Sequence, residues 1–171
     1  MVHLILTVIA IGLSAALIGA SINYLNPTWP LIDRVATQVK SGVLSLEQGI
    51  NQYAVVNADV NVGLPTFPSV DTWEADVTPS YTFLPKPPPN LTYTYGESTA
   101  QPTYLGPGHY VCLSGAASEI QYKALVRAGR EMSPQQYVLS DTCGATAAGT
   151  PPVTWPATVA ATYWLTPIIG N

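Results

Sequence analysis

The stretch of sequence that decides the fold is LIDRVATQVKSGVLSLEQGINQYAVV, residues 31–56. Its apolar residues recur at spacings of three and four, which is the period of one face of an α-helix. They are Ile32, Val35, Val39, Val43, Leu46, Ile50 and Ala54. Most charged and amide side chains fall off this stripe, and Gly42 and Gly49 weaken the pattern without refuting it. The segment is therefore predicted to be one amphipathic helix.

Toward the N-terminus, this helix is preceded by NPTWP, residues 26–30. Pro27 and Pro30 each lack a backbone donor and disfavour helix in the residue before them. We therefore expect the helix to break or stretch over residues 24–30. Residues 27–56 would then continue the helical spine after the break.

Still earlier, LILTVIAIGLSAALIGASI, residues 4–22, contains no charged residue. About 20 such residues cross a hydrocarbon core of about 30 Å as a helix. A secretory signal cut near Ala20 is the competing interpretation, but such signals begin with a basic region and only Met1, Val2 and His3 precede the run. We expect residues 1–26 to be retained as an apolar helix, buried in lipid or among copies of itself.

Residues 57–171 change character and are predicted to form a small β-rich domain. Prolines crowd residues 57–107, which predicts a long connecting loop with short strands. A short helix is expected over residues 116–130, with Ser118 as its N-cap. The expected strands lie within residues 92–95, 109–115, 135–143 and 158–165. The predicted fold class is α+β: a long, interrupted N-terminal helix packed on a small antiparallel sheet.

The composition limits the classes of function. Charged residues make up 9% of the chain, against about 25% in an average soluble protein. Six basic residues stand against ten acidic ones, and the pI is near 4.9. Binding to phosphates requires a surface rich in Lys and Arg. Nucleic acid is therefore not expected as a primary ligand.

The cysteines are Cys112 and Cys143 alone. In an exported chain, an even pair indicates one disulfide formed in an oxidising compartment, and two free buried thiols are the alternative. Closing a loop of about 30 residues stabilises a domain by roughly 3 kcal/mol. With His3 and His109 as the only histidines, no metal site is expected.

No pattern of catalytic residues emerges, so the chain is not expected to be an enzyme or to need a cofactor. Ser114 lies in CLSGA, which lacks the GxSxG context of a hydrolase nucleophile. Asp71, Glu74 and Asp76 form a small acidic cluster that lacks the ligand spacing of a calcium loop. A solvated loop is the favoured interpretation of that cluster.

Lys123, Arg127 and Arg130 follow spacings of four and three, which places them on one face of the predicted short helix. A solvated face is the favoured interpretation. The alternative is that this basic stripe meets an acidic patch on a neighbouring subunit and sets the register of a filament. The candidate acidic residues are Asp59, Asp71, Glu74, Asp76 and Glu97.

The order of these segments resembles that of a type IV pilin, of the type IVb kind, or of a related pseudopilin. An apolar N-terminal helix runs into an amphipathic helix ending in INQYAVVNADVNVGLP, residues 50–65, and a Pro-rich loop, strands and a C-terminal cysteine pair follow. The layout resembles the family over the whole chain, but the similarity of sequence lies mainly in residues 1–65. The resemblance implies a ladle-shaped fold with an exposed region bounded by Cys112 and Cys143.

The resemblance also implies a function. The chain is expected to be a structural subunit of an extracellular pilus, held in the inner membrane before the pilus machinery assembles it with copies of itself. Attachment or motility would be properties of the filament. A pseudopilin of a type II secretion system and a membrane-tethered monomeric binding domain are the alternatives. The residues expected to serve assembly are Met1, Ile5, Leu6, Ile9, Leu13, Leu17, Pro27 and Pro30.

One residue departs from the family pattern. Pilins are processed by a peptidase that removes a short basic leader, and residue 1 is expected to be the mature N-terminus. Most pilins then carry Glu at the fifth position, to neutralise the amine of a neighbouring subunit, whereas this chain has Ile5. An unpaired ammonium is costly in an apolar core. Three solutions stay open: Thr7 or backbone carbonyls as acceptors, a methylated amine near solvent or lipid, or a place at the filament tip.

Overall fold

The computed structural model describes residues 11, 13–14, 28–59, 64–98 and 108–166. The chain divides into two compact units, residues 1–31 and 32–171. In the first unit, Ile11, Leu13 and Ser14 are helical and exposed. The second unit holds the sheet and most of the long helix, and it is the unit whose packing is described below.

The long amphipathic helix is present as α2, Thr28–Val56. The predicted apolar stripe is buried at every position except Val35, which is half-buried while its neighbour Ala36 is buried. The buried face also includes Gly42 and Gly49. The buried face is therefore wider than the predicted apolar stripe, because it also includes these two glycines.

The predicted break does not extend to Pro30. Helix α2 already begins at Thr28, so Pro30 lies in its first turn. The first four N–H groups of a helix have no intrahelical acceptor, so a proline there removes no hydrogen bond. The expectation of a break through Pro30 was therefore wrong, and Pro27 lies outside the described residues.

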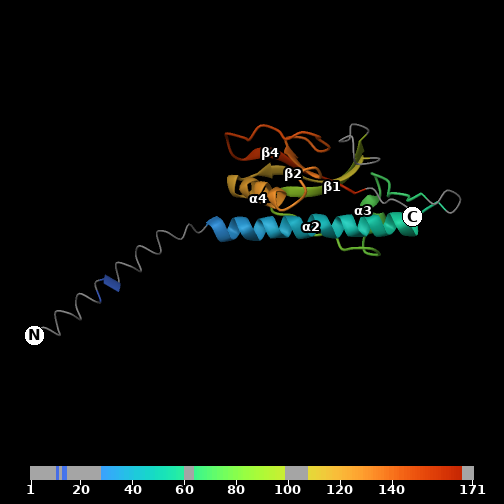
Figure 1. Ribbon diagram of the computed structural model, residues 1–171, viewed down its shortest axis with the longest axis horizontal. Helices are drawn as coiled ribbons and strands as arrows, with labels where there is room; N and C mark the ends of the chain where they lie inside the picture. Colours follow the sequence, from blue (N-terminus) through green and yellow to red (C-terminus); the bar gives the residue numbers. More distant parts are fainter. Residues whose placement is uncertain (1–10, 12, 15–27, 60–63, 99–107, 167–171) are drawn as a thin grey trace, which may run out of the picture. The chain divides into compact units, whose positions relative to one another are not determined.

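Four strands form one antiparallel sheet in the order β1-β2-β4-β3. Their bounds are Leu91–Ser98 for β1, Gly108–Ala117 for β2, Tyr137–Ser140 for β3 and Ala157–Trp164 for β4. The C-terminal strand β4 thus lies between β2 and β3. The α+β class is confirmed, and Figure 1 shows the sheet lying along one side of α2.

The short helix predicted after β2 is α4, Glu119–Arg130. Its N-cap is Ser118, as predicted, and Ser118 and Gln121 form a reciprocal capping box. The helix starts later than expected because Ala116 and Ala117 still belong to β2. Gln121 Nε2 also donates to the carbonyl of Pro89, 2.7 Å away, which ties the start of α4 to the segment before β1.

The sequence did not indicate the short helix α3, Trp73–Val77, within the Pro-rich region. Its two apolar ends, Trp73 and Val77, are buried in the core. Five residues are too few for a helical period to stand out from a loop. Helix α3 therefore forms because these two side chains pack into the core, and not because of a local sequence pattern.

The core lies between α2 and one face of the sheet. Leu46 and Ile50 of α2 and Leu113 of β2 are completely buried there. Strand residues reach this face in register, because Leu113 pairs with Tyr93 on one side and with Ala161 on the other. Burying a large aliphatic side chain contributes about 1.5–3 kcal/mol. This contact is therefore the main source of stability for the domain.

Gly42 and Gly49 are required by a segment that runs along the flank of α2. A Cβ at Gly49 would lie 2.5 Å from the side chain of Thr82, and one at Gly42 would collide with the hydroxyl of Tyr93. The segment is held by a 2.9 Å hydrogen bond between the hydroxyls of Ser45 and Thr82. The two glycines therefore allow residues 82–86 to lie close to the helix.

We predict that Gly42→Ala destabilises the domain although it raises the helix propensity of α2. The gain in propensity is about 1 kcal/mol, whereas an overpacked core position costs about 1–3 kcal/mol. Tyr93→Phe should restore much of this loss in the double variant, because the Tyr93 hydroxyl is buried without a hydrogen-bond partner. Thermal unfolding of the full chain in detergent, followed by circular dichroism, measures both changes.

Thr37→Ala is the matched control, because Thr37 is exposed on the same helix. It should leave the unfolding temperature unchanged or raise it slightly. A Gly42→Ala chain as stable as the Thr37→Ala chain would contradict the close packing described above.

Candidate functional site

The predicted basic stripe on α4 does not act as one free surface. Lys123 pairs with Glu119 of the same helix at 2.7 Å. The Nε of Arg127 lies 2.6 Å from Oδ1 of Asp33 in α2. Arg130 is exposed and forms no ion pair within the described residues. Two of the three predicted cations therefore have partners inside the chain.

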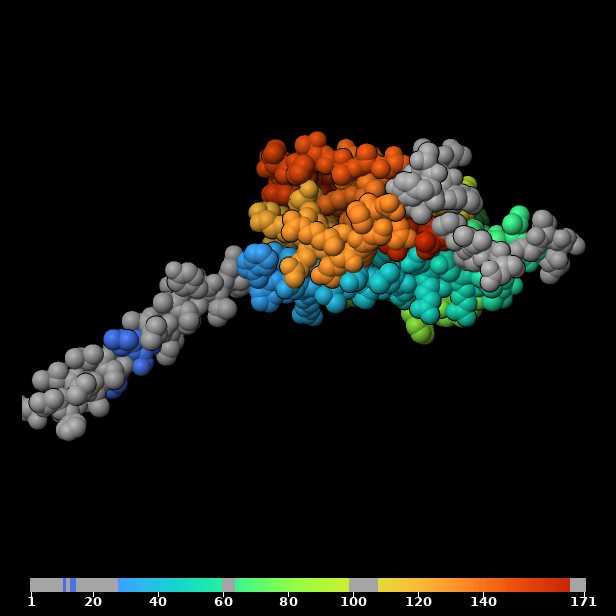
Figure 2. All heavy atoms as spheres, in the orientation of Figure 1, coloured from blue at the N-terminus to red at the C-terminus, as the bar shows by residue number. Residues whose placement is uncertain are grey.

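Two ion pairs join α4 and the residue after it to α2. One is the pair of Arg127 in α4 with Asp33 in α2. The other joins Glu131, just after α4, to Lys40 in α2 at 3.1 Å. All four side chains are more than a third exposed, and such surface pairs contribute about 0–1 kcal/mol each. They therefore orient α4 on α2 more than they stabilise the domain. Figure 2 shows the orange atoms of this region against the blue and cyan of α2.

Spacing along the chain could not reveal these ion pairs, because the partners are about ninety residues apart (Lys40 and Glu131 by 91). Sequence spacing likewise could not reveal the contacts of Glu47, which is half-buried in α2. Its carboxylate accepts hydrogen bonds from the hydroxyls of Tyr163 at 3.0 Å and Thr166 at 2.7 Å. Glu47 therefore holds the end of β4 against the helix.

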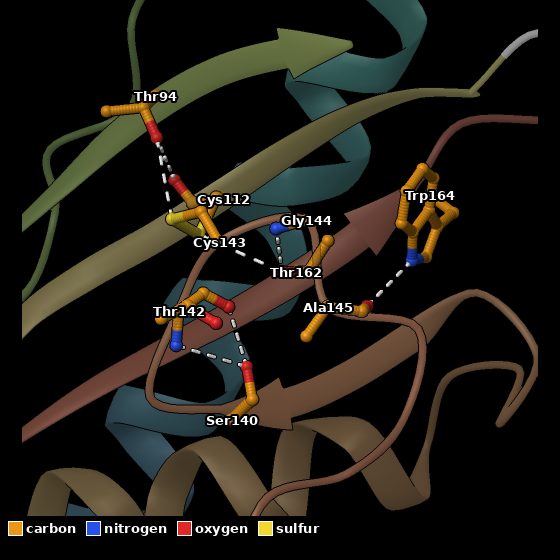
Figure 3. Close-up of a disulfide and its surroundings, with 9 residues drawn as sticks. All are labelled: Thr94, Cys112, Ser140, Thr142, Cys143, Gly144, Ala145, Thr162 and Trp164. Carbon is orange, nitrogen blue, oxygen red and sulfur yellow. Dashed lines mark hydrogen bonds between the residues drawn. A yellow bond between two sulfur atoms is a disulfide. The ribbon is translucent and has the colours of Figure 1, made fainter. Parts of the chain in front are cut away.

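On the other face of the sheet, a disulfide joins Cys112 of β2 to Cys143 in the loop after β3, as the sequence suggested. The bond passes over β4, because Cys112 pairs in register with Thr162 of that strand. Figure 3 shows the loop folded back over the strand, with Gly144 N–H donating to the Thr162 hydroxyl at 3.0 Å. The disulfide thus fixes this loop on the face of the sheet that α2 does not cover.

A further hydrogen bond holds the same loop, from Trp164 Nε1 to the carbonyl of Ala145 at 3.3 Å. Trp164 is completely buried, although it is one of the largest side chains in the domain. Figure 3 shows its ring beside the returning loop. The loop is therefore a cover for the outer side of β4 and not a free extension.

We predict that the double variant Cys112→Ala/Cys143→Ala loses about 3–4 kcal/mol of unfolding free energy, because the disulfide closes a separation of 31 residues. Denaturant unfolding of the oxidised parent and the variant measures this difference. Reducing the parent chain should give the same loss. If neither change lowers the denaturation midpoint, the hydrogen bonds of residues 144–145 hold the loop without the disulfide.

A cavity of about 690 Å³ opens at the end of the sheet that carries the last residues of β1 and the first of β2. It is lined by residues 64–65 and 67–71, by Glu97 and His109 from these two strands, and by residues 165–166 after β4. Its walls are mainly apolar, and its charged side chains in the described part of the chain are the carboxylates of Asp71 and Glu97. The cavity is therefore an apolar recess with acidic groups.

His109 lies in a stack of rings beside this cavity. Its ring is stacked on Phe67 with centroids 4.1 Å apart and on Tyr95 at 5.7 Å. Its Nδ1 is hydrogen-bonded to the Tyr95 hydroxyl at 2.7 Å. Burial lowers the pKa of His109, although the nearby Glu97 opposes this. Burial therefore favours the uncharged form of His109, and no Lys or Arg among the described residues lines the recess to offset its carboxylates.

The sequence did not single out Phe67 or Tyr95, because aromatic residues at unrelated positions carry no spacing signal. A hint was present in His109, which starts a predicted strand and is one of two histidines. The strand register now explains the cluster, since His109 pairs with Glu97.

The acidic cluster Asp71, Glu74 and Asp76 lies at α3 and just before it. The Thr72 hydroxyl donates to Oδ2 of Asp76 at 2.6 Å, so this carboxylate has a local partner. Within the described ranges, no group of three or more His, Cys, Asp or Glu side chains is arranged to hold a metal ion. The calcium interpretation thus gains no geometric support.

The residues predicted to serve assembly lie mostly outside the described residues. These are Met1, Ile5, Leu6, Ile9, Leu17 and Pro27. Leu13 is helical, with 60% of its surface exposed. Of the helices that the structure does describe, none combines the length and hydropathy needed to span a bilayer.

Comparison with known proteins found nothing similar: no family model, no curated protein and no solved structure matches this chain. The resemblance to type IV pilins therefore stays a prediction from the residues quoted above.

Proposed function

We propose that this chain is a structural subunit of an extracellular filament of the type IV pilus kind. In this proposal the apolar N-terminal segment continues α2 as the handle of a ladle and forms the filament core with its copies. The sheet domain forms the outer wall. The chain would be held in the inner membrane until the pilus machinery adds it to the filament.

The observation that carries the proposal is the combination of α2 with what precedes it in sequence. A helix of 29 residues buries one face against a four-stranded antiparallel sheet. Residues 4–22, shortly before it, contain no charge. Such a segment is stable only in lipid or against other apolar helices. A polymer in which residues 4–22 of neighbouring copies pack against one another provides this apolar surrounding.

Two features of the described residues support this role. Trp29 and Leu31, at the start of α2, are 57% and 46% exposed, so they present apolar surface near the expected core. The disulfide fits the oxidising environment outside the cytoplasm. Both features suit a subunit that leaves the membrane and packs against copies of itself.

Electron microscopy of filaments sheared from cells that express the full chain with a pilus assembly system tests the proposal. Mass spectrometry of the purified filaments should identify this chain as a component. A chain found only as a membrane-bound monomer would exclude the proposal and favour the tethered binding domain. Short assemblies confined to the periplasm would favour the pseudopilin.

We predict that Ile9→Lys abolishes these filaments, because it places a charge within the apolar segment, where Lys costs up to about 2.5–3.5 kcal/mol at the centre of a helix. Ile9→Leu is the matched control and should assemble normally. Formation of the Cys112–Cys143 disulfide in both variants, seen on non-reducing gels, shows that the sheet domain still folds. Normal filaments from Ile9→Lys would mean that this segment is not in the core.

A further inference from the structure

All six Lys and Arg residues and all ten Asp and Glu residues lie within the described ranges, so the ion pairs among these side chains can be followed. The three ion pairs use Lys40, Lys123 and Arg127. The remaining cations, Arg34 and Lys86 together with Arg130, are all exposed and form no ion pair. Half of the basic residues are thus available to a partner.

The backbone positions of these three cations lie along residues 34–40 of α2, in the N-terminal half of the helix. Arg34 is adjacent to Asp33, the partner of Arg127. Arg130 precedes Glu131, which pairs with Lys40. The carbonyl of Lys86 accepts a hydrogen bond of 2.8 Å from Gln38. We call Arg34, Lys86 and Arg130 the basic end of the sheet domain.

Carboxylates gather near the other end of α2. Asp71, Glu74 and Glu97 are exposed and form no ion pair within the described residues. The segment of Asp71 and Glu74 is anchored there, because Thr66 N–H donates to the carbonyl of Ala54 at 3.1 Å, and Glu97 lines the same cavity as Asp71. Val77 of α3 likewise lies close to Gly49. We call Asp71, Glu74 and Glu97 the acidic end.

The two ends are too far apart to neutralise each other within one chain. The basic end lies beside residues 33–40 of α2 and the acidic end beside residues 49–54. At 1.5 Å per residue, this separates them by roughly 20 Å along the helix. Charges at that distance are largely screened, because the Debye length is about 8 Å at physiological ionic strength. Each end therefore presents uncompensated charge.

We propose that copies of this chain contact one another head to tail, with the basic end of one sheet domain against the acidic end of the next. A two-fold contact between like ends would oppose like charges, which costs free energy. In a head-to-tail contact the second end of each copy stays free for a third copy, so the contact is heterologous, and such contacts generate open helical polymers when they do not close into a ring. This inference rests on the proposed filament function and specifies one of its interfaces.

The cavity makes the acidic end suited to an arginine side chain. Asp71 and Glu97 both line it, beside the stacked rings of Phe67 and His109. A guanidinium pairs with carboxylates through two parallel hydrogen bonds and stacks on aromatic faces. Two of the three cations of the basic end are arginines. The recess therefore accepts the guanidinium of Arg34 or Arg130 from the next copy.

Reversing the charge of each end in the full chain tests this contact. One variant carries Arg34→Glu, Lys86→Glu and Arg130→Glu, and another carries Asp71→Lys, Glu74→Lys and Glu97→Lys. Each alone should reduce filament yield tenfold or more, because like charges then meet. A chain with both ends reversed should assemble again, and so should a mixture of the two variants expressed together. Asp141→Lys is the control, because Asp141 is exposed and lies outside the acidic end.

The outcomes separate this inference from the proposed function. If the parent chain forms filaments and the reversed variants do so equally well, the head-to-tail contact is wrong and the filament function stands. If the parent chain forms no filaments, zero-length carbodiimide cross-linking of mixed unlabelled and ¹⁵N-labelled full chains in vesicles decides the contact. Cross-links from Lys86 of one chain to acidic-end carboxylates of another support it, and their absence overturns it.

Discussion

The contact between one face of α2 and the inner face of the sheet is the constraint on which the rest of the structure depends. It buries Val39, Leu46 and Ile50 completely, and it requires strand residues such as Leu113 to point toward the helix. A strand that slipped by one residue would turn these side chains to the opposite face. The helix therefore fixes the register of the sheet, and the sheet fixes which face of the helix is buried.

The two faces of the sheet are covered by different means. Alpha-helix α2 covers one face through apolar burial, and Glu47 adds hydrogen bonds to Tyr163 and Thr166. The other face is covered by a loop that the Cys112–Cys143 disulfide holds in place. With only 9% charged residues, the domain has few ion pairs to add. The disulfide and the apolar contacts therefore stabilise the domain, and ion pairs add little.

Most of the fold could be predicted from patterns that are local in sequence. The helical period of residues 31–56, the N-cap at Ser118 and the lone cysteine pair predicted the features that the structure shows. The predicted break at Pro30 was wrong because a proline is compatible with the first turn of a helix, and the sequence does not mark where that turn begins.

The remaining features depend on residues that meet only in the folded chain. Helix α3 is set by the packing of Trp73 and Val77, and the ring stack on His109 joins a loop residue to two strands. The ion pairs of Asp33 and Lys40 cross most of the chain. No spacing rule connects such positions, so the candidate site was visible only as scattered aromatic and acidic residues.

The strand order has a consequence for how the domain forms during synthesis. Strand β4, Ala157–Trp164, is the last in sequence but lies between β2 and β3. Until it arrives, β2 and β3 have no neighbour to connect them, and the half of the sheet around them is open. Because a chain is synthesised from its N-terminus, the sheet cannot close before Ala157–Trp164 have been made. A copy truncated before β4 therefore cannot join β3 to the rest of the sheet.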